Sequence, residues 1–181
     1  VDLLRAGFEP DRLPQAVAIP SSLDQLAAAV GYLSAARTPV WPVGGATLSA
    51  VAYRPFSGGV AVSTAGLNRI LDITPENLTV RVEAGCTPQA LAEELARLEL
   101  PLFYPVDCAR HPRSTFGSEI ATNASGLLRP TYGSTRDLLL GISFVDASGR
   151  VCRPGGMTVK NVAGYDVSRL LCGAWGSLGI I

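Results

Sequence analysis

The chain has 181 residues, of which 48% are hydrophobic and 17% are charged, and its 15 basic residues balance its 15 acidic ones. This composition is typical of a folded domain rather than a disordered chain, and without a basic surplus the chain is a poor candidate for a general nucleic-acid binder or membrane-surface binder. No apolar run approaches the ~20 residues of a membrane-spanning helix, so we expect no membrane span.

In the first third of the chain, the sequence predicts a strand, a helix and two further strands. These elements are sufficient to form a small, partly parallel sheet. Ser21 or Ser22 is expected to cap the helix, which carries apolar residues at helical spacing and ends near Arg37. The expected strands are residues 16–20, 40–43 and 59–63.

The rest of the chain predicts pairs of strands with helices beside them. Pro75-Glu76-Asn77 is expected to form a turn between two strands, and Ser148-Gly149 to form a hairpin turn between two others. Thr87 and Asp166 are expected to cap two helices, the first running to about Leu98. The expected strands are residues 68–74, 78–84, 141–147, 150–153 and 178–181, with a break between two lobes near residues 64–74.

The segment PVGGATL at residues 42–48 is the first candidate for a ligand site. Two glycines follow a strand, so backbone amides at 44 and 45 are able to turn inward and converge on an anion, and Thr47 adds a hydroxyl donor. Such a nest holds a pyrophosphate without a positive side chain. An ordinary Gly-Gly turn is the alternative. The segment is neither a Walker loop nor a GxGxxG nicotinamide fingerprint.

The segment TFGSEIATNASG at residues 115–126 is rich in small and hydroxyl side chains. Backbone is able to approach a flat ligand closely here, with Thr122 and Asn123 hydrogen-bonded to its edge. A small-residue helix packed tightly in the core explains the same pattern equally well.

Two later segments are the remaining candidates for a ligand site. Residues 155–166 mix Lys160, Asn161 and Tyr165 with apolar residues, so these polar groups either satisfy one another or face a ligand. Residues 173–181, GAWGSLGII, again place glycines before an expected strand.

Cysteine and histidine are sparse. The cysteines Cys86, Cys108, Cys152 and Cys172 are widely spaced and form no CxxC pair, so we expect reduced thiols and no metal site. His111 is the one histidine of the chain, and no GxSxG motif accompanies it, which argues against a Ser-His-Asp hydrolase.

In this order and spacing, the four segments resemble the FAD-binding domain of the vanillyl-alcohol oxidase and p-cresol methylhydroxylase (PCMH) superfamily. PVGGATL is similar to its pyrophosphate loop, TFGSEIATNASG followed by YGSTRDLLLGI to its long flavin-contacting segment, and VEAGCTPQALAEEL to the strand and helix between them. The segment GMTVKNVAGYDVSRLLCGAWGSLGII resembles the branch of this superfamily that contains glycolate oxidase and D-lactate dehydrogenase flavoproteins. Its amino-acid sequence most resembles that of the FAD-binding E subunit of glycolate oxidase. The resemblance covers about residues 16–181.

The resemblance implies an α+β fold of two lobes with FAD gripped between them. A small, partly parallel sheet lobe is expected at about residues 1–66, and a mainly antiparallel sheet lobe with flanking helices at about residues 67–181. Residues 1–181 then form one PCMH-type FAD-binding domain. The family continues into a C-terminal substrate-binding cap domain, which is absent from this sequence.

The resemblance also implies which residues bind FAD. The first loop would offer backbone amides to the pyrophosphate, a second group would line the flavin and diphosphate, and a third would lie near the adenine. These are, in turn, Pro42, Val43, Gly44, Gly45, Ala46, Thr47 and Leu48; Thr115, Gly117, Ser118, Ala121, Thr122, Asn123, Gly126, Tyr132 and Gly133; and Gly176 and Ile180. Several relatives attach FAD through a histidine in the first loop, where this chain has Ala46, so we expect non-covalent FAD.

The implied reaction is hydride transfer from the hydroxyl-bearing carbon of a small 2-hydroxy acid such as glycolate to the flavin, which gives the 2-oxo acid. The catalytic residues stay unassigned, because in such enzymes they usually belong to the cap domain. Lys160, Arg136 and His111 are single candidates with no evident second partner. The implied partners are a second flavoprotein subunit and an iron–sulfur subunit. The implied location is the cytoplasm, either free or attached peripherally to the inner membrane through those subunits.

Three alternatives stay open. The first is a D-lactate or 2-hydroxyglutarate dehydrogenase of the same superfamily, and the second is a flavin-binding subunit without turnover of its own. The third is an α+β domain that binds no cofactor. The visible absorption spectrum of the purified protein separates the third from the other two.

Overall fold

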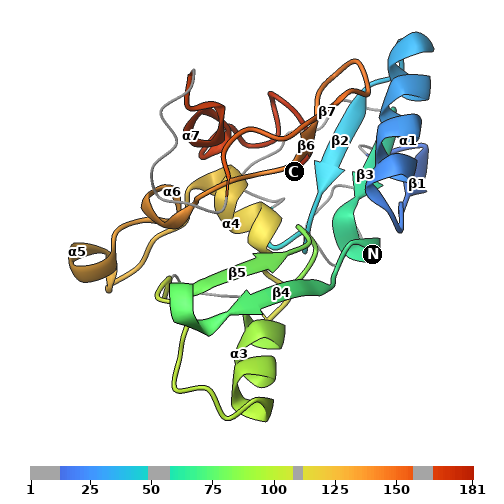
Figure 1. The fold of residues 1–181 in the computed structure, drawn as a ribbon. Helices are drawn as coiled ribbons and strands as arrows, with labels where there is room; N and C mark the ends of the chain where they lie inside the picture. Colours follow the sequence, from blue (N-terminus) through green and yellow to red (C-terminus); the bar gives the residue numbers. More distant parts are fainter. Residues whose placement is uncertain (1–12, 49–57, 108–111, 157–164) are drawn as a thin grey trace.

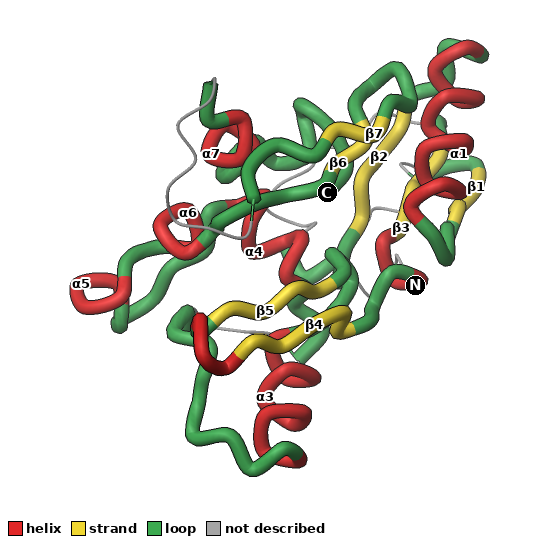
Figure 2. The backbone as a smooth tube through the Cα atoms, in the orientation of Figure 1, coloured by secondary structure: helices red, strands yellow, loops and turns green. Residues whose placement is uncertain are grey.

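The computed structural model describes residues 13–48, 58–107, 112–156 and 165–181 (Figure 1). Short strands and helices follow one another along the chain, and Figure 2 shows long loops joining those of the second half. In chain order they are β1 Ala16–Ala18, α1 Leu23–Ala35, β2 Val40–Val43, β3 Val60–Ser63, η2 Thr64–Gly66, β4 Ile70–Thr74, η3 Pro75–Asn77, β5 Thr79–Val82, α3 Pro88–Arg97, α4 Phe116–Thr122, α5 Arg129–Tyr132, α6 Thr135–Leu138, β6 Phe144–Val145, β7 Val151–Cys152 and α7 Val167–Leu171, where η marks a 3-10 helix.

The N-terminal part is a three-stranded sheet in the order β1-β3-β2, with both strand pairs parallel. Helix α1 connects β1 to β2 and lies against this sheet (Figure 1). Leu26, Val30 and Leu33 share one face of the helix and are buried together with Val62 of β3 and with Leu67. Burial of this apolar face contributes most of the stability of such a helix.

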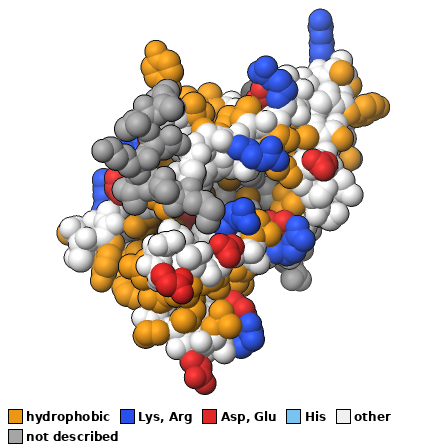
Figure 3. Space-filling model, viewed as in Figure 1, with side chains coloured by type: hydrophobic (Ala, Val, Ile, Leu, Met, Phe, Trp, Pro, Cys, Tyr) orange, Lys and Arg blue, Asp and Glu red, His pale blue; other side chains and the backbone are white. Residues whose placement is uncertain are grey.

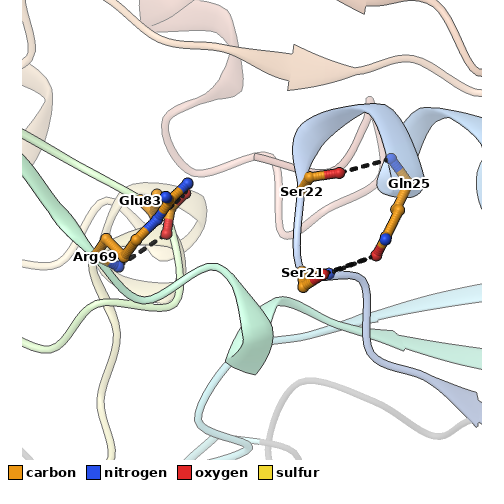
Figure 4. Close-up of polar contacts among 5 residues, drawn as sticks. All are labelled: Ser21, Ser22, Gln25, Arg69 and Glu83. Atoms are coloured by element: carbon orange, nitrogen blue, oxygen red, sulfur yellow. Dashed lines mark hydrogen bonds and ion pairs between the residues drawn. The ribbon is translucent and has the colours of Figure 1, made fainter.

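Helix α1 begins where the sequence predicted, because neighbouring side chains satisfy its first backbone groups (Figure 4). Ser22 is the N-cap, and its Oγ accepts a hydrogen bond from the Gln25 N–H at 3.2 Å. The Gln25 Oε1 in turn accepts hydrogen bonds from the N–H and the hydroxyl of Ser21, at 2.9 and 3.0 Å. Of the two predicted capping residues, Ser22 is therefore the one that caps.

Strands β4 and β5 form an antiparallel hairpin, and α3 packs against it through an apolar cluster that includes Leu91 and Leu95. At the open end of the hairpin, Arg69 and Glu83 point toward each other (Figure 4). The Arg69 N–H donates to Glu83 Oε2 at 2.8 Å, and Arg69 Nη2 lies 2.7 Å from Oε1. The hydrogen bonds from Arg69 hold the pKa of Glu83 below its ordinary value. This pair ties the two ends of the hairpin together.

The C-terminal part of the chain returns to the core of the N-terminal sheet. Strands β6 and β7 form a short antiparallel pair, and Val145 also bridges Ile180 through two backbone hydrogen bonds of 2.8 and 2.9 Å. Both residues are buried in the cluster that surrounds α1. The strand predicted at residues 178–181 is reduced to this single bridge, because Gly179 adopts φ 155, outside the usual strand conformation.

The β6–β7 turn yields a prediction about acid stability. The Asp146 carboxylate accepts hydrogen bonds from the Ser148 hydroxyl at 2.6 Å and from the Arg150 N–H at 3.0 Å, and these bonds hold its pKa well below the ordinary value. Because the folded-state pKa is depressed, the contribution of Asp146 to stability is present above its unfolded pKa of ~3.9 and is lost as the pH falls from there toward the folded pKa. We expect D146N to lower Tm at pH 7 by a few degrees, and the gap to wild type to narrow below about pH 4. Thermal melts at pH 7 and pH 3 measure this gap, and a gap of equal size at both pH values contradicts the prediction.

The expected fold class is confirmed: the fold is α+β, with a small parallel sheet, antiparallel strands and flanking helices. It differs in detail, because the described residues contain two separate two-stranded sheets, β4-β5 and β6-β7, in place of one antiparallel sheet. Helices α5, α6 and α7 lie on the opposite side of the view from α1 (Figures 1 and 2). Over the ranges that the structure describes, no helix has the length and apolar character needed to cross a membrane.

Candidate functional site

A cleft lies between three parts of the chain that are far apart in sequence: the loop that follows β2, helix α4 and the C-terminal segment. Its empty volume is about 770 Å³, part of which is open to solvent. The loop contributes Pro42, Val43, Gly44, Ala46, Thr47 and Leu48; α4 contributes Gly117, Ser118, Ala121 and Thr122; the C-terminal segment contributes Trp175, Gly176, Gly179, Ile180 and Ile181; and Thr64 completes the lining.

The parallel sheet brings two of these segments together. In its register Val43, the last residue of β2, is paired with Ser63, the last residue of β3. The chain after both strands therefore leaves the sheet at the same edge, where parallel sheets commonly bind ligands. Gly44 and Thr64 are the residues that follow, and both line the cleft.

The loop after β2 is held close to the start of α4. A side chain at Gly45 would place its Cβ only 1.6 Å from the backbone oxygen of Arg113, so glycine is required there for close packing of two backbones. A Cβ at Gly44 would lie 2.7 Å from Thr115 Oγ1. Ala46 adopts φ 55, a left-handed conformation that few residues other than glycine take. The loop is therefore shaped by its contacts with residues 113–115.

Helix α4 presents small side chains to the cleft but uses its first backbone amides internally. Thr115 is the N-cap: its Oγ1 accepts from the Ser118 N–H, while Ser118 Oγ accepts from the Thr115 N–H at 3.0 Å. The Phe116 and Gly117 N–H groups donate to the carbonyls of Cys86 and Ala84, at 2.9 and 2.8 Å. The start of α4 is thus satisfied by protein groups and offers little to an anion.

The loop after β2 has backbone N–H groups that are available to a ligand. Within the part of the chain that the structure describes, no hydrogen bond uses the N–H of Gly45 or Thr47. Among the described residues, none of those that line the cleft has a charged side chain. An anionic group bound in this cleft would therefore depend on backbone amides and hydroxyls, which is how a nest of amides holds a phosphate.

The C-terminal wall of the cleft is clamped onto the end of α4. The Gly173 N–H donates to the Ile120 carbonyl at 3.1 Å, and the Trp175 N–H donates to the Ala121 carbonyl at 2.9 Å. Arg136 Nη2 donates to the Cys172 carbonyl at 2.7 Å. This use of Arg136, one of the candidate catalytic residues, gives its side chain a structural role.

The structure gathers twelve of the predicted FAD-binding residues around the cleft and places six elsewhere. Gly45 lies behind the loop, against Arg113, and Thr115 is buried as the cap of α4. Asn123 ends α4 in the left-handed conformation, φ 49, and its Oδ1 accepts from the Arg136 N–H at 3.1 Å. The side-chain oxygen of Asn123 thus binds the backbone of α6, and the hydrogen bond from Asn123 to the ligand's edge stays a prediction.

The remaining three predicted FAD-binding residues that do not line the cleft lie beyond the turn at Asn123. A Cβ at Gly126 would lie 2.3 Å from Asp107 Oδ1, so this glycine permits close packing against residue 107. Gly133 has φ 86 and ends α5. The ring of Tyr132 packs edge-on against Phe103, with ring centroids 5.7 Å apart. The chain turns away from the cleft at Asn123, so these residues pack against other parts of the fold.

Sequence reasoning missed four residues that line the cleft: Thr64, Trp175, Gly179 and Ile181. Three of them belong to the GAWGSLGII segment, in which only Gly176 and Ile180 are predicted to bind FAD. Thr64 had a usable signal as well, because it directly follows the strand predicted at residues 59–63, in the same partly parallel sheet as the strand that runs into PVGGATL. Loops after neighbouring parallel strands meet at one edge.

Other candidates for chemistry lie apart from the cleft or outside the described residues. Burial raises the pKa of the Cys86 and Cys172 thiols, which keeps both protonated at neutral pH. His111, Lys160, Asn161 and Cys108 lie outside the described residues. Among described residues, no group of three or more His, Cys, Asp or Glu side chains is placed to hold a metal ion. On the face in Figure 3, basic and acidic side chains are interspersed.

Comparison with known proteins gives a consistent result. The sequence profile of the family described as "FAD binding domain" matches residues 14–155. Glycolate oxidase subunit GlcD of Bacillus subtilis (strain 168) is 36% identical over 169 residues, which are 93% of this chain and 36% of that protein. D-2-hydroxyglutarate dehydrogenase of Xanthomonas citri pv. viticola is 35% identical over 93% of this chain and 35% of its own length. D-lactate dehydrogenase of Anaerostipes hadrus is 31% identical over 93% of this chain and 35% of its own length.

The chain thus spans about a third of the length of these curated relatives. Among solved structures, alkyldihydroxyacetonephosphate synthase superposes with a TM-score of 0.75 at 22% identity, over 91% of this chain and 32% of that chain. A second crystal form of the synthase gives a TM-score of 0.77 at 23% identity, over 91% and 30%. These structures share the fold with the chain.

Proposed function

Because the chain belongs to the FAD binding domain family, we propose that it holds the FAD of an oxidoreductase that oxidises a small 2-hydroxy acid, with glycolate as the first candidate. The profile match confirms the family that the four sequence segments indicated, and FAD is the cofactor of that family. The observation that carries the proposal is the cleft between the loop after β2, α4 and the C-terminal segment, whose described lining has no charged side chain.

The residues at the cleft fit a dinucleotide. The N–H group of Thr47, a residue of the cleft lining, is the donor for its pyrophosphate, and it lies in a loop whose neighbouring backbone approaches closely. Small residues of α4, such as Gly117 and Ala121, leave room for a flat ring. When bound, FAD supplies the hydride acceptor. The chain supplies position and a largely apolar wall that limits the access of water.

The names of the relatives support the substrate class. Glycolate, D-lactate and D-2-hydroxyglutarate, named in the three relatives, are all acids with a hydroxyl group on the carbon next to the carboxylate. The part of the cleft lining that the structure describes has no charged side chain to hold that carboxylate. We therefore place the groups that bind the substrate's carboxylate and accept its hydroxyl proton outside this lining, in agreement with the greater length of the relatives.

The same reasoning extends to partners and location. The relative in Bacillus subtilis is named as a subunit of glycolate oxidase. We place this chain in a comparable assembly with a second flavoprotein subunit and an iron–sulfur subunit, which would carry the electrons away. The location that goes with such an assembly is the cytoplasm. Co-purification from native cells, followed by iron analysis of the complex, tests this part of the proposal.

We expect the FAD to be bound without a covalent link. The PVGGATL loop has Ala46 where a histidine would be needed, and the described lining of the cleft contains no histidine, cysteine or tyrosine. Denaturing the yellow protein with acid or heat should release all of the flavin into the supernatant. Yellow colour that stays with the precipitated protein contradicts this expectation.

The proposed reaction is tested by anaerobic reduction of the bound flavin. The FAD-loaded protein is mixed with glycolate, D-lactate or D-2-hydroxyglutarate, and the loss of the visible flavin band is followed, with acetate as a control that lacks the hydroxyl group. Because the groups that bind and deprotonate the substrate are placed outside the cleft lining, we expect these 181 residues alone to show little bleaching. When the part found in the longer relatives, or the partner subunits, is supplied, we expect at least one hydroxy acid to bleach the flavin, and the fastest identifies the substrate. Bound FAD that no hydroxy acid reduces, even with the partner subunits present, points instead to a flavin-binding subunit without turnover.

A further inference from the structure

Trp175 is a large aromatic side chain at the surface of the cleft. It lines the cleft and is 42% exposed. The second tryptophan of the chain, Trp41, is by contrast 6% exposed and buried with Val43 and Ala61. Among the described residues of the lining, Trp175 is the one with an aromatic ring.

The backbone of Trp175 is strained. Its φ is 55, in the left-handed region that bulky L residues avoid and that glycine occupies without penalty. The strain persists because the segment is tied down on both sides: the Trp175 N–H donates to the Ala121 carbonyl at 2.9 Å, and the Ser177 N–H donates to the Ala174 carbonyl at 3.0 Å. Strained residues held in this way are concentrated at ligand sites.

The ring and the cofactor have matching chemistry. FAD carries two flat aromatic ring systems, the isoalloxazine and the adenine, and the cleft otherwise offers aliphatic carbon, hydroxyls and backbone. Stacking of a base on an aromatic side chain contributes substantially to affinity and needs no charge. We propose that the Trp175 indole stacks on an aromatic ring of bound FAD and contributes to its affinity. This inference rests on the proposed binding of FAD in the cleft.

Two substitutions separate the ring from the backbone. W175F keeps an aromatic ring, W175L keeps only apolar bulk, and both keep the Cβ atom and therefore the same left-handed strain. Each protein, freed of flavin, is titrated with FAD while the flavin fluorescence is followed. We expect W175L to bind FAD about tenfold more weakly than wild type, and W175F to stay within about threefold. Thermal melts of the flavin-free proteins show whether the folds are equally stable.

Titration with FMN, which lacks the adenine, identifies the ring. Equal weakening of FAD and FMN binding in W175L places the indole on the isoalloxazine, and weakening of FAD binding alone places it on the adenine. Wild-type affinity in W175L overturns the inference. So does equal weakening in W175F and W175L together with equal loss of thermal stability, because the role of Trp175 is then structural. Failure of the wild-type protein to bind FAD overturns the proposed function, and this inference with it.

Discussion

G45V is expected to weaken FAD binding at least tenfold, which corresponds to about 1.4 kcal/mol or more. A Cβ at this position would lie 1.6 Å from the backbone oxygen of Arg113 and 2.6 Å from its carbonyl carbon. Two backbones meet there, so no rotation of a side chain relieves the clash. The loop must move away from residues 113–115, and the N–H groups of Gly45 and Thr47 move with it.

The measurement is a titration of the flavin-free protein with FAD, compared with a control substitution. Gly31 of α1 is a suitable control, because its Cβ would meet nothing closer than the Ser148 backbone oxygen at 3.7 Å. G31A should leave FAD affinity unchanged and raise the stability of the helix by up to ~1 kcal/mol. Wild-type affinity in G45V would show that the loop lies away from the cofactor. A loss in G31A equal to that in G45V would show that the assay reports general destabilisation.

G85A is expected to destabilise the protein by about 3 kcal/mol, lowering Tm by roughly 10 °C. Gly85 follows β5 and lies against the chain just after β3, where its N–H donates to the Leu67 carbonyl at 2.7 Å. A Cβ here would lie 2.0 Å from the Thr64 backbone oxygen and 2.7 Å from that of Leu67. Because two backbone oxygens are in the way, the β4–β5 hairpin must separate from η2.

Thermal unfolding of the flavin-free protein measures this effect directly, with G31A again as the matched glycine-to-alanine control. Thr64 lines the cleft, so a displaced η2 should also reduce FAD affinity. The relative size of the two effects distinguishes the two glycines: G85A mainly lowers thermal stability, whereas G45V mainly lowers FAD affinity. A Tm for G85A within about 2 °C of wild type would contradict the close packing around Gly85.

Local chemistry made much of the fold predictable. Ser22, Thr87 and Asp166 all cap the helices that they were expected to cap, because capping depends on a side chain and the N–H groups within the next turn. The turn at residues 75–77 was predictable because proline and asparagine are typical turn residues. The predicted strand at residues 40–43 has the observed bounds, whereas the strand predicted at residues 141–147 is reduced to Phe144–Val145 and an isolated bridge between Gly141 and Gly155. The partner strand was predicted at residues 150–153, but how many residues pair depends on backbone contacts that the local sequence does not show.

The sequence by itself determined the capped helices, the parallel and antiparallel strand types, and the segments that carry the cleft. Only the tertiary structure decided which residues within those segments face it. Ala121 and Thr122 reach the cleft, whereas residues 126–133 do not, because the left-handed turn at Asn123 redirects the chain toward α6. Trp175 reaches it because hydrogen bonds to the end of α4 hold its segment there. These contacts join residues of different elements, such as Trp175 and Ala121, and no local sequence pattern encodes their direction.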